Sequence, residues 1–406
     1  MTMRKVCKLY FKETLKRMFH VDHLIIVLFT FAQLLIIGLF VFNISFLNPI
    51  ATALKNFSIT DTFFEIQHSE QDSISDDLIT LVDIKELYSR EDIGLLIEQI
   101  GEENPLVIGI DIIFEGIKDD SLGNSILIES VEKVKDISVF ANKLTDYSSE
   151  KRAFQTEVKS FFADSIKVSE GFTNLTDNMQ GATIRECVTV SSLNEEKCLS
   201  FPAKIAMSID STLEVEHDKP NLINYKNTKF NIVKYNEIKY KRDLIDGHVV
   251  LLGTIGEEAD MHNSPIGKIS GIEIQAYTLL MMLEHQKTHK VPGLVNLLFA
   301  FILCYIFELI LHKTFKSICS YQKNPFMVFL KKSNLVTFIL LSTMLVSLCW
   351  FFYYTFIKFD VVFDGTLILA SIALVCESRD IYQALIISLK TKYKWRFLYN
   401  SIMIND

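Results

Sequence analysis

The sequence predicts an α/β extracytoplasmic domain with a mixed, partly parallel sheet, attached to four transmembrane α-helices. Two observations lead to this fold class. Apolar runs long enough to cross a bilayer stand near the N-terminus and in the last third of the chain. Between them, short apolar runs typical of buried strands alternate with segments of helical periodicity. The mean hydropathy of +0.25 over 406 residues agrees with a membrane protein.

The apolar runs give four predicted membrane spans. Residues 24–44 contain no charged side chain, and the long basic leader before them favours a retained anchor over a cleaved signal peptide. Residues 291–312 carry one carboxylate, Glu308, and residues 335–357 end in an aromatic cluster typical of a membrane interface. The fourth span, residues 361–378, is short, and the charge distribution supports it.

The charges predict the orientation of the spans. Residues 45–290 contain 24 Lys+Arg and 41 Asp+Glu, whereas the rest of the chain contains 17 and 8. The basic residues concentrate in the leader 1–23, the loop 313–334 and the tail 379–406, which four spans place on one side. Because cytoplasmic segments are enriched in Lys and Arg, we expect both termini in the cytoplasm and residues 45–290 outside it. The acidity of this domain argues against nucleic-acid binding.

The extracytoplasmic domain opens with a predicted β-α-β unit. Residues 78–84 form an apolar strand, and Ser89 with Asp92 resembles a helix capping box. Pro105 ends the helix, and residues 106–114 return as a second strand. A crossover of this kind predicts two parallel neighbouring strands. Further predicted elements are a helix near Asp119 and Asp120, a strand at 137–141, a hairpin around 188–197, a helix from Pro202, a strand from 248 and a helix over 271–286.

Cys187 and Cys198 are the only cysteines in this domain. They flank "VTVSSLNEEK", which predicts two strands around a polar turn, so a disulfide in an oxidising compartment is expected. Two free thiols are the alternative. A zinc site would need two further ligands nearby, and the sequence offers none, so no bound metal is predicted.

Four residues are candidates for ligand binding. Asp83 and Asp111 lie on the two strands expected to be adjacent, where an acidic pocket could take a cation or an amine. The alternative is that each aspartate anchors a loop, which the position of Asp111 within an apolar run favours. Asp260 and His262 lie in a glycine-containing loop, where neighbouring carboxylates would repel a phosphate and His262 could respond to pH.

No enzymatic signature is present, so we predict neither catalytic activity nor a cofactor. The sequence contains no G-x-S-x-G, no H-E-x-x-H and no Walker-type loop. The tail segment "KTKYKWRF" interleaves basic and aromatic residues and predicts contact with the membrane surface or a partner; an ordinary positive flank is the alternative. Its residues are Lys390, Lys392, Lys394, Trp395 and Arg396.

The order of these segments resembles the CHASE2 family of bacterial extracytoplasmic sensor domains. "LVDI", "GIDIIF", "VVLLGTIGEEAD" and "SPIGKISGIEIQA" follow one span and precede three, and the resemblance covers roughly residues 25–378. The best-matching positions are Asp83, Asp111, Phe114, Asp260, Pro265 and residues 271–276.

This resemblance implies a sensor in the inner membrane of a bacterium. Such domains are thought to detect an external signal, a small molecule or a protein, and to pass it to a cytoplasmic output such as a kinase or a nucleotide cyclase. Nothing like an output domain follows residue 378, so we expect a separate effector protein. A homodimer is an arrangement that this kind of sensor often uses. The alternative function is a structural or scaffold subunit of an envelope assembly.

Overall fold

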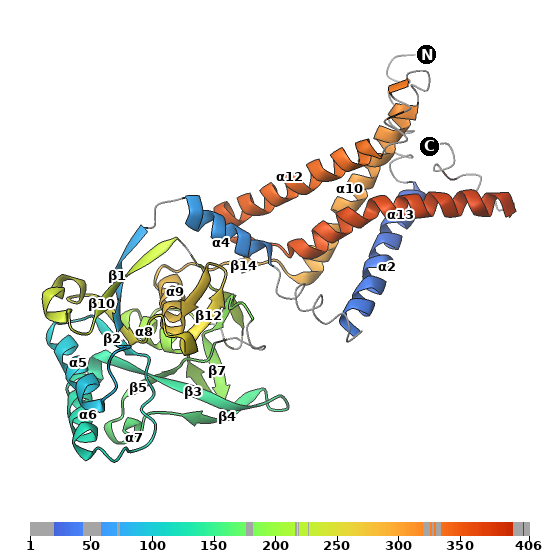
Figure 1. The fold of residues 1–406 in the computed structure, drawn as a ribbon. Coiled ribbons are helices and arrows are strands. Elements are labelled where there is room, and N and C mark those ends of the chain that lie inside the picture. The colour runs from blue at the N-terminus through green and yellow to red at the C-terminus, as the bar shows by residue number, and fades with distance from the viewer. Residues whose placement is uncertain are drawn as a thin grey trace. The chain divides into compact units, whose positions relative to one another are not determined.

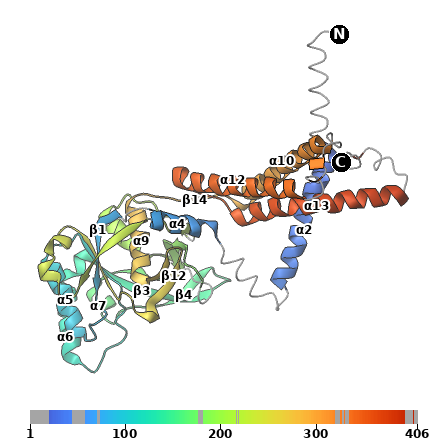
Figure 2. The same cartoon turned by 45° about the horizontal axis from the view of Figure 1, so that its top comes forward.

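The structure is a computed structural model that describes residues 20–43, 58–70, 74–175, 182–215, 217, 219–225, 227–319, 325–326, 329, 334–392 and 401. It divides into two compact units (Figures 1 and 2). Residues 60–289 form the first, here called the middle unit. Residues 1–59 and 290–406 form the second, here called the helical unit.

The middle unit is built on a mixed, partly parallel sheet, as the sequence predicts. The strands follow the order β10-β1-β11-β2-β3-β4-β7-β8, and β5 also pairs with β3. All pairs among β10, β1, β11, β2, β3 and β5 are parallel, whereas β4 runs antiparallel to β3. The strands are β1 (Ile74–Asp83), β2 (Val107–Ile110), β3 (Ser138–Ser148), β4 (Ala153–Val158), β5 (Ser169–Phe172), β7 (Val190–Leu193), β8 (Glu196–Leu199), β10 (Thr228–Lys234) and β11 (Val249–Gly253).

Two expectations about the centre of the sheet are wrong. β1 and β2 are parallel but not adjacent, because β11 lies between them and pairs with both. All five residues of β11 are buried, so this strand requires a position with neighbours on both edges and helices on both faces. The second strand is also shorter than expected. It ends at Ile110, and the backbone from Asp111 leaves the sheet.

One face of the sheet is covered by α5 (Arg90–Glu102) and α6 (Ser121–Val134) (Figure 1). The two helices approach closely at Gly94, where an added Cβ would lie 2.9 Å from the Cα of Leu127. Both predicted starts are confirmed: Ser89 caps α5 by accepting from the backbone N–H of Asp92, and Asp120 caps α6. The core beneath them includes Ile97, Ile100, Leu127, Val131, Ile108, Val250 and Leu252.

The other face is covered by α8 (Phe201–Ile209) and α9 (Gly271–Leu283). Pro202 stands in the first turn of α8, as predicted. Around these lie the smaller elements α4 (Ile59–Glu70), α7 (Ala163–Ile166), β6 (Glu186–Val188), β9 (Pro220–Leu222), β12 (Met261–Ser264), β13 (Gly267–Ser270) and short 3-10 turns at 135–137, 238–240, 242–244 and 258–260.

The predicted disulfide is not formed: Cys187 and Cys198 are free thiols. The hairpin exists as β7 and β8, but the residue opposite Cys198 is Ser191. Cys187 precedes the hairpin and lies on β6, which pairs with β9 in a separate small sheet. The sequence indicated the turn correctly, but the chain changes sheets at Thr189, so the two cysteines have different strand partners. Burial raises the pKa of the Cys187 thiol to about 12, which makes it a poor nucleophile.

The helical unit contains α2 (Val21–Asn43), α10 (Gly293–Cys319), α12 (Leu335–Phe359) and α13 (Gly365–Lys392). Within the described part of the chain, three helices are long and apolar enough to cross a membrane: Val21–Asn43, Gly293–Ser317 and Leu335–Phe359. The fourth predicted span lies in α13, which does not meet that criterion. This helix continues to Lys392, where a tail was expected, and carries Glu377, Arg379 and Asp380.

Arg90 holds the loop that follows β2. Its side chain is only 4% exposed. Nη1 donates to Asn124 Oδ1 at 2.5 Å, and Nη2 donates to the carbonyls of Glu115 and Gly116 at 2.9 and 2.8 Å. The guanidinium also lies 4.7 Å from the ring centre of Phe161. These bonds draw the chain out of the sheet after Ile110, which explains why the apolar run does not continue as a strand.

We predict that Arg90→Met lowers the free energy of unfolding by about 2–3 kcal/mol, because it removes three charge-assisted donors from a buried position. Denaturant unfolding of the full chain in lipid nanodiscs, followed by circular dichroism, measures the change. The matched control is Arg152→Met at an exposed position, for which we expect less than about 0.5 kcal/mol. Equal losses for the two variants would contradict the structural role of Arg90.

Candidate functional site

The carboxyl edge of the parallel strands brings three of the four predicted site residues together. Asp111 follows the last residue of β2, and both Asp260 and His262 act on its carboxyl electrostatically. His262 Nε2 lies 3.7 Å from Asp260 Oδ1. Ligands of parallel α/β sheets tend to bind at this edge. The group Asp111, Asp260 and His262 is called the acidic edge below.

Two of the aspartates anchor loops. Asp83 Oδ1 accepts from the backbone N–H of Lys85 at 3.0 Å and from that of Ile255 at 3.2 Å. It therefore ties the end of β1 to the loop after β11. Asp260 Oδ2 accepts from the backbone N–H of Gly271 at the start of α9, at 3.3 Å. An added Cβ at Gly271 would lie 3.0 Å from Asp260 Oδ1, so the carboxylate packs closely against the backbone at the start of α9.

Asp111 has no such role. Within the described residues, no group donates a hydrogen bond to its carboxylate, although its backbone N–H donates to the carbonyl of Leu252 at 2.8 Å. The expectation that Asp111 is a mid-strand anchor therefore does not hold, because it lies beyond the strand. Burial, and secondly the charge of Asp260, raise its pKa to about 7, while His262 opposes the rise. Asp111 is thus a carboxyl group that exchanges its proton near neutral pH.

The glycine loop after β11 offers little to an anion. The N–H of Gly256, which has a φ of +70°, already donates to Ser270 Oγ at 2.8 Å. Across the described ranges, no three His, Cys, Asp or Glu side chains are placed to hold a metal ion. The two carboxylates and the imidazole of the acidic edge can accept a proton or the positive group of a ligand.

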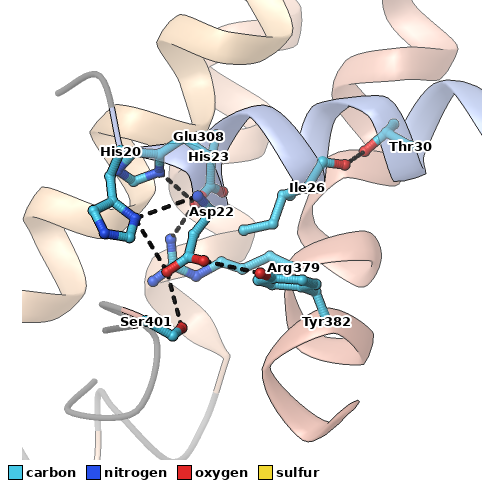
Figure 3. Close-up of polar contacts among 9 residues, drawn as sticks. All are labelled: His20, Asp22, His23, Ile26, Thr30, Glu308, Arg379, Tyr382 and Ser401. Atoms are coloured by element: carbon cyan, nitrogen blue, oxygen red, sulfur yellow. Dashed lines mark hydrogen bonds and ion pairs between the residues drawn. The ribbon is translucent and has the colours of Figure 1, made fainter. Parts of the chain in front are cut away.

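A second site, which the sequence did not reveal, lies within the helical unit (Figure 3). Glu308 on α10 is fully buried. Its Oε1 lies 2.8 Å from Arg379 Nη1 on α13 and 3.3 Å from His23 Nδ1 on α2. Asp22, also fully buried, accepts from Tyr382 Oη on α13 at 2.9 Å. The group Asp22, His23, Glu308, Arg379 and Tyr382 is called the polar cluster below.

The polar cluster joins three helices. His23–Glu308 links α2 to α10, Glu308–Arg379 links α10 to α13, and Tyr382–Asp22 links α13 back to α2. Ser401 Oγ also donates to Asp22 Oδ2 at 2.9 Å. Ionisable side chains among apolar helices are expensive to bury, and they commonly mark functional positions. The arrangement can hold the helices in one register and can release them when a pair is broken.

The sequence contains a signal for this cluster, but the predicted boundaries of the membrane spans separate its residues. Glu308 stood out as the one carboxylate in its span, but His23 was assigned to the leader and Arg379 to the tail. Charged residues at the ends of several apolar runs point to mutual pairing. Of the predicted tail contacts, Lys390 and Lys392 lie in the last turn of α13, while Lys394, Trp395 and Arg396 lie outside the described residues.

Asp111 makes stability depend on pH. Its folded-state pKa of about 7 exceeds the unfolded value of 3.8, so its stabilising effect is complete below pH 3.8 and is lost as pH rises through 7. Asp111→Asn cannot ionise and should escape this loss. We expect the variant to exceed the wild type by about 1–3 kcal/mol at pH 8, and by clearly less at pH 5. Thermal unfolding at both pH values measures this, with the exposed Asp119→Asn as control. A gap independent of pH would contradict the assignment.

Glu308 and Arg379 should be energetically coupled. Glu308→Gln leaves a buried guanidinium without its carboxylate, and Arg379→Gln leaves the opposite charge, so each should cost about 3 kcal/mol. The double variant should lose clearly less than the sum. Unfolding of the full chain in mixed micelles completes the cycle, with the exposed Glu377→Gln on α13 as control. Strictly additive losses would show that the two side chains do not act as a pair.

The comparisons with known proteins agree with this architecture. Residues 32–310, more than half of the chain, match the family described as CHASE2 domain. No curated protein and no solved structure gives a significant match. The matched region includes the second half of α2, the whole middle unit and α10 as far as Ile310. The chain therefore belongs to the CHASE2 family of sensor domains.

Proposed function

We propose that this protein is a bacterial inner-membrane sensor whose middle unit detects an extracytoplasmic signal and whose helical unit relays it to a separate effector protein. The observation that carries the proposal is the polar cluster, because it connects the two helices that flank the middle unit in the chain. Family membership supports the sensing role. Three apolar helices support the membrane location.

The chain itself provides a path for the signal. α2 precedes the middle unit and α10 follows it, so a change in the middle unit acts on both helices through covalent connections. The two helices meet again at His23 and Glu308, 3.3 Å apart. A displacement of α10 relative to α2 therefore changes a buried charged contact. Such contacts favour two discrete arrangements over gradual deformation, because a partly separated buried pair is costly.

Charge distribution supports the orientation. Asp22 and His23 lie in the first turn of α2, next to the basic leader. Glu308 lies about 22 Å along α10 and Arg379 about 21 Å along α13, at a rise of 1.5 Å per residue. With a hydrocarbon core of about 30 Å, this places the polar cluster near one face of the membrane. In this proposal α13 crosses the membrane as a fourth span, and the positive-inside rule then favours a cytoplasmic position for that face and for both termini, where an effector can reach them.

The basic end of α13 is the proposed docking point for the effector. Lys390 and Lys392 occupy its last turn, and Arg379 of the polar cluster lies on the same helix. A shift of α13 would therefore move the docking point directly. Lysine side chains also favour the anionic inner leaflet, which would keep this end of the helix at the membrane surface.

The experiment is purification of the tagged full chain from native membranes in mild detergent, with quantitative mass spectrometry. We expect a protein with a cytoplasmic catalytic domain, such as a kinase or nucleotide cyclase, in fixed ratio. The double variant Lys390→Glu/Lys392→Glu should lose it. The matched control Lys229→Glu/Lys268→Glu, on exposed positions of the middle unit, should retain it.

The relay has its own readout in the same preparation. Glu308→Gln should keep the effector bound but change its catalytic activity, because the variant breaks the contact between the flanking helices. If only structural or transport proteins of the envelope co-purify, a scaffold role replaces the sensor. If Glu308→Gln leaves the activity of a bound effector unchanged, the polar cluster is not part of the relay.

A further inference from the structure

The middle unit contains a cavity of about 300 Å³ at the end of α9, away from the residues of the acidic edge. This volume lies at the lower end of the range for small-molecule sites. Its apolar lining comes from Met281 and Met282 on α9, Leu222 on β9, and Leu213 and Val215 after α8. These side chains come from separate parts of the chain, so the cavity depends on the folded unit.

The polar lining is mixed in charge and rich in neutral groups. Asn221 on β9 and Gln286 after α9 supply side-chain amides, and Thr189 and Thr288 supply hydroxyl groups. Gln286 Oε1 accepts from Asn224 Nδ2 at 2.6 Å, which fixes the orientation of this amide. Within the described residues, no group accepts a hydrogen bond from Gln286 Nε2. It is therefore a donor that a ligand could use.

The charged groups of the lining do not select one sign. Glu214 is exposed, and so are Lys287 and His285, so an acidic and two basic groups share the rim. His285 Nε2 also lies 3.8 Å from Asp210 Oδ2. A strongly charged ligand would meet both attraction and repulsion here, whereas a neutral head group would meet amides and hydroxyls. The methionines add flexible, polarisable walls that adapt to an apolar chain.

The cavity lies where occupancy can influence α10. Met281 and Met282 are in the last turn of α9, and the chain then passes through His285 to Thr288, all of which line the cavity. α10 begins at Gly293, five residues after Thr288. The backbone of this segment folds back on the helix end: the N–H of Gln286 donates to the carbonyl of Met281 at 3.0 Å.

We propose that this cavity is the signal-binding pocket of the sensor and that it takes a small amphipathic molecule with a short apolar chain and a neutral amide head group. The proposal rests on the sensor function proposed above and names its ligand class. The apolar chain lies against Met281, Met282 and Leu222. The head group bonds to Asn221 and Gln286. Binding orders the segment 285–288, and that segment leads directly into the helix that carries Glu308.

The test uses the full chain in lipid nanodiscs with methionine labelled at its ¹³C methyl group. The probes are N-butanoyl-, N-hexanoyl- and N-octanoylglycinamide, and empty nanodiscs correct for partitioning. Met281→Leu and Met282→Leu assign the two pocket signals. We expect saturable shifts of both with at least one probe, and none at Met261 on β12, which does not line the cavity. Met282→Trp, which fills the cavity, should weaken binding at least about tenfold.

A second variant keeps the test informative if Met282→Trp does not fold. Asn221→Leu removes a head-group amide at similar volume and should also weaken binding while the Met261 signal stays in place. The proposal is overturned if no probe gives saturable shifts at Met281 and Met282, or if Met261 shifts equally. Binding without any change in effector activity would overturn the relay and leave the pocket standing. Absence of binding would overturn the pocket and leave the relay standing.

Discussion

The ion pair between Glu308 and Arg379 is the interaction on which the arrangement of the helical unit depends. Both side chains are almost completely removed from solvent, and their atoms approach to 2.8 Å. Neither charge is tolerable alone among apolar helices, so each fixes the position of the other. His23 joins the same carboxylate from α2. The register of the three helices thus follows from the need of the buried Glu308 carboxylate for charged or hydrogen-bonding partners.

The middle unit also contains carboxylates partly removed from water, and they are compensated differently. Asp111 is partly buried at the end of β2 and gains no hydrogen-bond donor among the described residues, so desolvation raises its pKa and favours the protonated form. Asp83 and Asp260, by contrast, accept backbone N–H bonds and fix the loops around it. Asp83 and Asp260 therefore stabilise the loops at the edge of the sheet, whereas the carboxyl group of Asp111 remains available to bind a proton or a ligand. This division of roles gives the acidic edge its sensitivity near neutral pH.

In both units, a few hydrogen bonds fix the position of segments that are distant in the sequence. In the middle unit, Arg90 holds the loop that turns Asp111 away from the sheet. In the helical unit, Val291 donates to the carbonyl of Val362 at 2.9 Å, so the entrance to α10 is bonded to the entrance to α13. A change at the start of α10 therefore reaches α13 at two points, just before its first turn through this backbone bond and at its middle through Arg379. The relay we propose needs only these contacts and the rigidity of the helices.

The sequence by itself determined the elements with local causes. Periodicity and caps located α5 at Ser89 and α6 at Asp120, Pro202 marked α8, and the apolar runs located three helices that could span a membrane. Only the tertiary structure decided which elements are neighbours. β11 enters between β1 and β2 more than one hundred residues later, and Cys187 joins a different sheet from Cys198. The polar cluster likewise combines residues from the two ends of the chain. Such pairings follow from burial and charge compensation between distant segments, which no local pattern encodes.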